Sequence, residues 1–297
     1  MFKRLIIPLD GSRLSEAILP TAAHLAQKLQ AGVTLVHVIE RNAPKQVHGE
    51  PHLSEAAEAE TYLEGVRARC FPPEVPVEMH VHTTAIADVA RSIVDHAHEF
   101  ESDLVMMCTH GRSGIKNLLF GSIAQQVVAS GVPVLLVRPQ ESGPVPVPQE
   151  GAFLVPLDGT EIREAALPAA ASLARACGRS VQLLVIVPTL DTLTGAETTS
   201  RILLPATTQE MLDIAHEDAG KYANEMLARL RAEGTPATAH VRRGDATKLI
   251  TKEAQSAGAD LIIMGTSARA GLDAFWSGSV APRVSRHTHL PILLIPG

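Results

Sequence analysis

Short runs of apolar, mostly β-branched residues alternate along the chain with longer stretches in which apolar positions recur at helical spacing. The first pattern predicts strands and the second predicts amphipathic helices. In the first half we expect strands at residues 3–9, 33–39, 76–82, 103–108 and 133–138, and helices at residues 14–30, 53–70, 86–99 and 121–130. Wholly apolar runs such as "DLVMM" and "VPVLLV" are typical of a parallel sheet covered on both faces.

The pattern occurs twice. Residues 5–26, "LIIPLDGSRLSEAILPTAAHLA", align without a gap with residues 153–174, "FLVPLDGTEIREAALPAAASLA", and residues 102–127 align with residues 259–284. Such an internal duplication predicts two similar domains, at residues 1–140 and 151–297. The proline- and glycine-rich residues 141–150, "ESGPVPVPQE", are the predicted linker. Each half is predicted to be an α/β doubly wound domain with a five-stranded, mostly parallel sheet and helices on both faces.

Each half ends in an apolar strand, "VPVLLV" at residues 132–137 and "LPILLI" at residues 290–295. An exposed sheet edge this apolar is prone to association, so we expect the two edges to pair across a pseudo-twofold axis. The linker is long enough to permit it.

Two local features interrupt the helical pattern. Pro20 and Pro168 fall within the first predicted helix of each half, where proline kinks a helix or marks its true start. The second half also has a longer segment at residues 188–210, which is interpreted either as a lid over a binding crevice or as a plain loop. A helix is predicted to follow it, at residues 210–232.

Composition and charge narrow the function. The net charge is -6 and no run of lysine or arginine occurs, which argues against nucleic acid as a partner. Three widely separated cysteines, no CxxC spacing and no apolar run of membrane-spanning length predict a cytoplasmic protein that does not enter a membrane.

Residues 108–122, "CTHGRSGIKNLLFGS", are the strongest candidate for a binding site. They follow a predicted strand and open a helix at Gly121 and Ser122. Backbone N–H groups at a helix N-terminus bind phosphate, and glycine lets the anion approach. The alternative is structural, with Ser122 acting as a helix N-cap and Gly111 serving a turn.

A carboxylate follows the first strand of each half, Asp10 in "PLDGS" and Asp158 in "PLDGT". It would repel a phosphate placed beside it, but it accepts a hydrogen bond from an exocyclic amine such as that of adenine. The alternative is an N-cap for the following helix.

Together these motifs resemble the universal stress protein family, whose loop has a glycine, two residues, a glycine, nine residues, a glycine and then serine or threonine. The chain looks like a tandem member. The resemblance to the ATP-binding branch implies an adenine nucleotide, ATP with or without Mg²⁺, as the ligand, and dimerisation through the last strand, here as a homodimer of tandem chains. It implies nucleotide contacts from Asp10, Val38, Met107, Cys108, Gly111, Gly121, Ser122 and Ile123 in the first half, and from Asp158, Ile186, Met264, Gly265, Ala268, Gly278, Ser279 and Val280 in the second.

Each half departs from the family's loop once, at Cys108 and at Ala268. We expect Ala268 to weaken nucleotide binding more than Cys108 does, because its position lies deeper in the loop. The charges also favour the first loop, since Lys116 of the first loop is replaced by Asp273 in the second. A carboxylate near the phosphate end repels a polyanion. The first half is therefore predicted to be the better nucleotide site.

Some other residues have weaker claims. His80 and His82 face the same side of one strand, a geometry that a metal could use. Two ligands without a third acidic or thiol partner are weak evidence for a metal site. His96 and His98 lie two apart on a helix and are expected to be solvated. Cys108 is either a low-pKa thiol or, more commonly for such a residue, a small buried one.

Three functions stay open. The leading hypothesis is a regulatory nucleotide-binding module that signals to an unknown protein partner in a stress response. A slow ATPase on the same fold is the second, although no P-loop lysine pattern is present. The third is an interaction scaffold without nucleotide.

Overall fold

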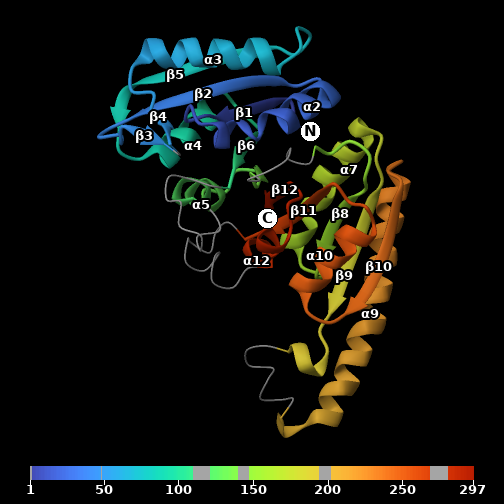
Figure 1. Ribbon diagram of the computed structural model, residues 1–297. Helices are drawn as coiled ribbons and strands as arrows, with labels where there is room; N and C mark the ends of the chain where they lie inside the picture. The colour runs from blue at the N-terminus through green and yellow to red at the C-terminus, as the bar shows by residue number, and fades with distance from the viewer. Residues whose placement is uncertain (1, 48, 110–120, 140–146, 194–201, 268–279) are drawn as a thin grey trace.

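The computed structural model of the chain describes residues 2–47, 49–109, 121–139, 147–193, 202–267 and 280–297. In the first half the strands are β1 (Arg4–Pro8), β2 (Gly32–Glu40), β3 (Gln46–Val47), β4 (Glu50–Pro51), β5 (Val77–Ile86), β6 (Leu104–Cys108) and β7 (Val134–Val137). The helices are α1 (Arg13–Glu16), α2 (Leu19–Leu29), α3 (Ala56–Cys70), α4 (Val89–Glu99) and α5 (Ser122–Ala129) (Figure 1).

The second half repeats this order except that its described residues include no counterpart of β3 and β4. Its strands are β8 (Phe153–Leu157), β9 (Val181–Val187), β10 (Ala237–Arg243), β11 (Leu261–Thr266) and β12 (Ile292–Pro296). Its helices are α6 (Glu161–Glu164), α7 (Ala166–Cys177), the short 3-10 turn η1 (Leu190–Thr192), α9 (Pro205–Ala232), α10 (Ala246–Ser256) and α12 (Val280–His287).

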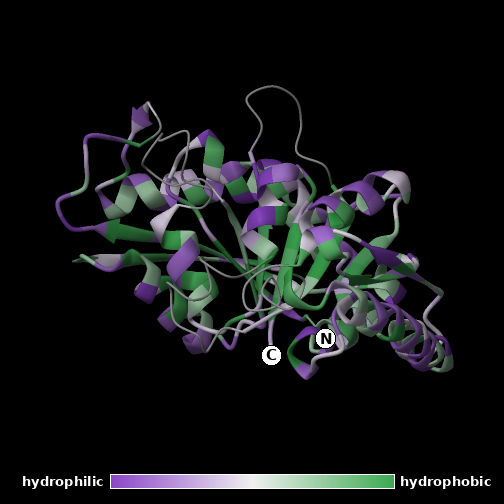
Figure 2. Cartoon of the chain, turned by 90° about the horizontal axis from the view of Figure 1, so that it is seen from below, coloured by the Kyte–Doolittle hydropathy of each residue, from purple (hydrophilic) through white to green (hydrophobic). Residues whose placement is uncertain are grey.

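Ten strands form one sheet in the order β10-β9-β8-β11-β12-β7-β6-β1-β2-β5. Within this sheet the pairing is parallel in each half, and each half has the same internal order, with its first strand in the middle. This is the doubly wound arrangement, and the predicted fold class is confirmed. Strands β3 and β4 form a separate antiparallel pair. Helices α2, α3, α7 and α9 cover one face, and α4, α5, α10 and α12 cover the other. The hydrophobic strands lie between helices that turn hydrophilic residues outward (Figure 2).

The two half-sheets join through their last strands, as predicted. Strands β7 and β12 pair antiparallel, with Leu135 opposite Leu293. These two leucines are equivalent positions of the duplicated sequence, and the flanking pairs, Leu136 with Ile292 and Val134 with Leu294, exchange equivalent residues. A pseudo-twofold axis therefore passes between Leu135 and Leu293, and the strand that the family resemblance assigned to dimerisation pairs within this chain. Association of two chains stays a prediction.

The two prolines mark helix starts and do not kink a longer helix, which confirms one of the two predicted alternatives. Pro20 is the second residue of α2, and Pro168 lies in the first turn of α7. The N–H groups of a first turn have no partner within the helix, so proline removes no bond there. The short helices α1 and α6 precede them as separate turns.

The segment at residues 188–210 is partly helical, so its prediction as a loop throughout is wrong. Helix α9 begins at Pro205, earlier than expected, and its 28 residues span about 42 Å at 1.5 Å per residue. The helix extends past the end of strands β9 and β10 (Figure 1). Residues 194–201 lie outside the described residues, and so does most of the predicted linker.

Leu135→Ala and Leu293→Ala should each lower the free energy of unfolding by about 2–5 kcal/mol, because both side chains are buried at the join. Since the two residues face each other, the double variant should deviate from additivity by about 0.5 kcal/mol or more in urea titrations. Leu203→Ala, at a leucine that is 70% exposed, is the control and should be near neutral. Strictly additive losses would contradict the direct pairing.

Candidate functional site

A cavity of about 100 Å³ opens in the first half, at the carboxyl ends of its strands. It lies where the strand order reverses, between the end of β1 and the end of β6, with β2 beyond β1. This is the position where open α/β sheets bind ligands. Its lining includes Leu9, Asp10, Ser15, His37, Val38, Glu40, Val89, Ile93, Met107, Cys108, Gly121, Ile123 and Ala124.

The cavity brings together six of the eight residues predicted for the first half: Asp10, Val38, Met107, Cys108, Gly121 and Ile123. Ser122 does not line it; it is the first residue of α5 and is exposed. Gly111 lies outside the described residues. The N-cap interpretation of Ser122 is wrong, because Gly121 holds that position.

Asp10 is held by the turn that follows β1. Its Oδ1 accepts hydrogen bonds from the Ser12 backbone N–H at 2.9 Å and from the Ser12 hydroxyl at 2.7 Å. Gly11 has φ +86°, a conformation that only glycine adopts readily, and it turns the chain so that this bond can form. The N-cap of α1 is Ser12, so Asp10 is not the cap. No described residue donates to Oδ2, which leaves that oxygen for a ligand.

The start of α5 supplies donors on the opposite wall of the cavity. The Gly121 N–H is already used, donating to the Thr109 carbonyl at 2.6 Å. The next N–H groups, of Ser122, Ile123 and Ala124, belong to the first turn and have no acceptor within the helix. They carry the partial positive charge of a helix N-terminus, which favours an anion.

The walls between these two ends are apolar. Val38 and Met107 come from the sheet, and Val89 and Ile93 from α4. Pockets for planar ligands combine apolar walls with a few fixed polar groups, and this cavity has that character. Nothing in the sequence pointed to Val89 or Ile93, because their contribution depends on how α4 packs across the sheet.

Cys108 is a buried residue at the end of β6, which confirms the second of the two predicted alternatives. Its Sγ lies 3.5 Å from the Ser15 carbonyl oxygen. Burial raises the pKa of the Cys108 thiol well above its usual range, so the thiol is neutral and unreactive. The low-pKa alternative is wrong.

The second half places an arginine where the first half has open space. Asp158 repeats the turn of Asp10, with Oδ1 accepting from the Thr160 N–H and hydroxyl, at 3.1 and 2.6 Å. Its Oδ2, however, accepts from Arg163 Nε at 3.3 Å, and Arg163 Nη1 donates to the Gly265 carbonyl oxygen. Arg163 thus bridges the ends of β8 and β11 and neutralises the carboxylate that a base amine would need.

Of the other second-half residues, Ile186 is at the end of β9, Met264 and Gly265 are in β11, and Val280 opens α12. Ala268, Gly278, Ser279 and Asp273 lie outside the described residues, so the expected effects of Ala268 and Asp273 stay predictions. Arg163 was missed by sequence reasoning. The signal was available, because Arg163 aligns with Ser15 within "GTEIREA" and "GSRLSEA".

The residue pair Cys108 and Gly265 contributes to the same asymmetry. A Cβ added at Gly265 would lie 2.1 Å from the Ile162 carbonyl oxygen, so only glycine permits α6 to pack this close to β11. Cys108 occupies the equivalent place in the first half, where its side chain stands between β6 and α1. The first half's departure from the family's glycine therefore goes with the open site.

Three histidines that the sequence analysis treated separately come together. The potential ligand atoms of His80, His82 and His96 all lie within 4.8 Å of one another. His96 is buried, so its expected solvation is wrong, whereas His98 is exposed as predicted. The three histidines form a candidate metal-binding group.

Both halves of the chain match the same family of known proteins. The universal stress protein family matches residues 1–138 and again residues 151–296. A universal stress protein of Bacillus subtilis, YxiE, is 29% identical over 148 residues, covering 46% of this chain and all of that protein. A crystal structure of a universal stress protein from Archaeoglobus fulgidus superposes with a TM-score of 0.65 at 18% identity, covering 99% of this chain and 96% of that one. A universal stress protein solved in complex with cAMP matches 47% of this chain and 98% of its own, at 21% identity and a TM-score of 0.35.

Gly265→Ala should lower the free energy of unfolding by about 1–3 kcal/mol, because the new methyl group collides with backbone atoms of α6. Gly220→Ala is the matched control: this glycine lies inside α9 with open space around it, and alanine should stabilise the helix by about 0.5–1 kcal/mol. Equal effects in thermal or urea unfolding would contradict the close approach of α6.

Proposed function

Since this chain belongs to the universal stress protein family, we propose that it is a regulatory protein of the stress response whose first half binds one adenine nucleotide, with ATP as the candidate ligand. The observation that carries the proposal is the shared cavity of Asp10 and the first turn of α5. The Asp10 carboxylate, whose Oδ2 has no donor among the described residues, and the first-turn residues Ile123 and Ala124 of α5 line one hollow at the switch point of the sheet.

We assign the adenine ring to the Asp10 end of the cavity. Asp10 Oδ2 accepts a hydrogen bond from the exocyclic amine, and the backbone of Val38, at the neighbouring strand end, lies on the same wall. Met107 and Ile93 supply apolar contact area for the ring. The cavity of about 100 Å³ is smaller than the roughly 300–1,000 Å³ of whole-ligand pockets, so it is expected to hold only part of the nucleotide.

We assign the phosphates to the start of α5. The N–H groups of Ser122, Ile123 and Ala124, which have no acceptor within the helix, and the partial positive charge of the helix favour an anion there. Gly111 belongs to this end by its place in the motif. Micromolar binding corresponds to about 8 kcal/mol, more than one helix end supplies, so base and phosphate contacts act together.

The second half is proposed not to bind the same ligand. Arg163 already pairs with Asp158 and the Gly265 carbonyl, so a base would have to break both interactions. One tandem chain then carries one nucleotide. A protein partner that responds to the bound nucleotide would therefore contact the first half. We place this activity in the cytoplasm. Within the described part of the chain, no helix is both long and apolar enough to cross a bilayer.

Asp10→Ala should weaken ATP binding at least about tenfold, because one hydrogen bond to a charged acceptor contributes about 1.5–3 kcal/mol. Asp158→Ala is the matched control in the other half and should leave the affinity unchanged. Isothermal titration with ATP measures both, and the wild-type chain should bind one ATP. Equal affinities for Asp10→Ala and the wild type would refute the assignment of the base site.

Ser15→Arg should abolish ATP binding, because it introduces into the first half the arginine that pairs with the aspartate in the second. Arg163→Ser, the reverse change, should leave the first-half affinity unchanged. Phosphate release measured on the same samples separates a binding protein from a slow ATPase. Retained ATP affinity in a folded Ser15→Arg protein would contradict the explanation of the asymmetry.

A further inference from the structure

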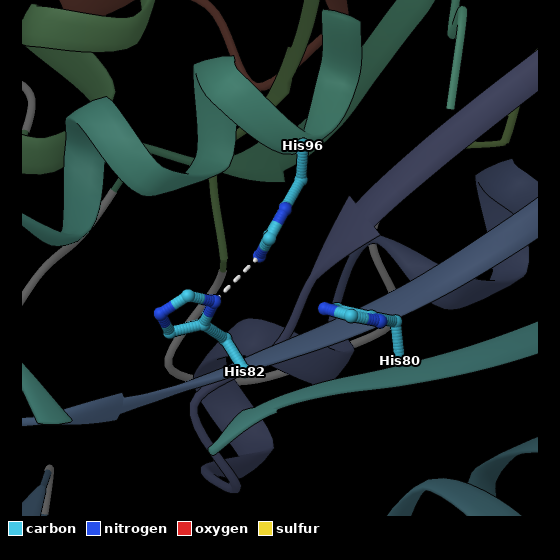
Figure 3. Close-up of side chains that lie close together, drawn as sticks. All are labelled: His80, His82 and His96. Atoms are coloured by element: carbon cyan, nitrogen blue, oxygen red, sulfur yellow. Dashed lines mark hydrogen bonds between the residues drawn. The ribbon is translucent and has the colours of Figure 1, made fainter. Parts of the chain in front are cut away.

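Three imidazoles meet on the face of the first half that α4 covers (Figure 3). His80 and His82 come from β5, where two-residue spacing puts both side chains on one face, and His96 comes from α4. His96 Nε2 lies 3.1 Å from His82 Nδ1, and the His80 and His96 ring centroids are 4.5 Å apart. Figure 3 shows the three rings directed toward a common point.

Imidazole nitrogens are ligands for zinc and similar transition ions. Tetrahedral zinc holds nitrogen ligands at about 2.0–2.1 Å, which puts them about 3.3 Å from each other. The His82 and His96 atoms are already at nearly this separation, and His80 completes the set within 4.8 Å. A modest movement of one ring therefore creates three ligands, with a fourth position for water or another donor.

One ring nitrogen of His80 has no partner among the described residues. His80 Nε2 is buried and makes no hydrogen bond with any residue that the structure describes. A buried polar atom without a partner is unusual in proteins, and a bound ion would satisfy it.

A carboxylate stands behind His96 as it does in many metal sites. His96 Nδ1 lies 3.0 Å from Glu99 Oε2, one helical turn along α4. A carboxylate that accepts from the far ring nitrogen fixes the tautomer, leaving Nε2 free for the metal, and increases the basicity of the ligand. Phe100 packs against both His80 and His96 and supplies an apolar wall.

The second half shows what this position contains without the cluster. His82 corresponds there to Arg242, and His96 corresponds to Glu253. Arg242 and Glu253 form a bidentate ion pair, in which Nε donates to Oε1 at 2.8 Å and Nη2 donates to Oε2 at 3.2 Å. That pair ties β10 to α10, just as a shared ligand would tie β5 to α4. Only His80 keeps its histidine, as His240. The fold thus uses a polar cross-link at this position in both halves.

We propose that His80, His82 and His96 form a site for one zinc ion, or another transition ion that prefers imidazole, with Glu99 as the positioning residue for His96. The ion cross-links β5 and α4. The site adjoins the nucleotide cavity without sharing a ligand with it, since His82 is the register partner of Val38 and Ile93 lies one turn before His96.

The test uses the full chain, stripped of metal with a chelator and titrated with Zn²⁺ in competition with a chromophoric chelator. We expect one zinc per chain at micromolar affinity or tighter. The informative variant combines His82→Arg with His96→Glu, because it installs the ion pair that the second half tolerates and should therefore fold while losing the site. Glu99→Gln should weaken zinc binding about 10–100-fold.

Two histidine variants are the controls. His98→Gln, at an exposed residue of the same helix, and His240→Gln, at the position equivalent to His80, should both leave zinc affinity unchanged. Circular dichroism confirms that each variant is folded, and Co²⁺ replacing zinc should give the visible absorption of a tetrahedral nitrogen site. A wild-type chain that fails to bind zinc, or unchanged affinity in the His82→Arg, His96→Glu double variant, would overturn the proposal.

Discussion

The antiparallel ladder between β7 and β12 is the interaction on which the rest of the architecture depends. It joins two five-stranded parallel sheets into one and hides two apolar edges that would otherwise attract other chains. Because its register is centred on Leu135 and Leu293, it also sets the symmetry of the molecule. The carboxyl ends of the strands, the position where open α/β sheets bind ligands, are therefore equivalent in the two half-sheets.

Equivalent positions need not keep equivalent chemistry. Both halves build the same aspartate turn after the first strand, and in both the aspartate accepts two hydrogen bonds from a hydroxyl residue. The difference comes from two substitutions. Arg163 in place of Ser15 neutralises one carboxylate, and Gly265 in place of Cys108 lets α6 close over the strand end. The half whose aspartate is paired with an arginine is the one that keeps the family's glycine at this position, so a match to that glycine does not predict an unpaired aspartate.

Much of the fold was predictable because its signals are local. The alternation of apolar runs with helical stretches predicts the strands and helices, and the apolar ends "VPVLLV" and "LPILLI" predict the join. The prolines of α2 and α7 predict helix starts, while the early start of α9 at Pro205 was missed because the preceding segment has no periodicity.

The site was predictable in part. Asp10 and Gly121 follow from the motif, since parallel strands bring their carboxyl ends together. The role of Arg163 depends on where a long side chain reaches, which spacing along the chain does not specify. His96 was expected to be solvated because helical spacing separates it from His98; it is buried because α4 packs over β5, and that contact is tertiary. In both cases, aligning the two halves would have drawn attention to the substituted position.

The pairing of equivalent leucines across a single chain has an evolutionary consequence. In an assembly of two identical subunits every substitution appears twice, so a change that closes one site closes both. Fusion removes that coupling, and selection can then retain a ligand-binding copy while the other is free to become a rigid support. The tandem gene is thus able to evolve an asymmetric protein from a symmetric ancestor without altering the contact that holds the copies together.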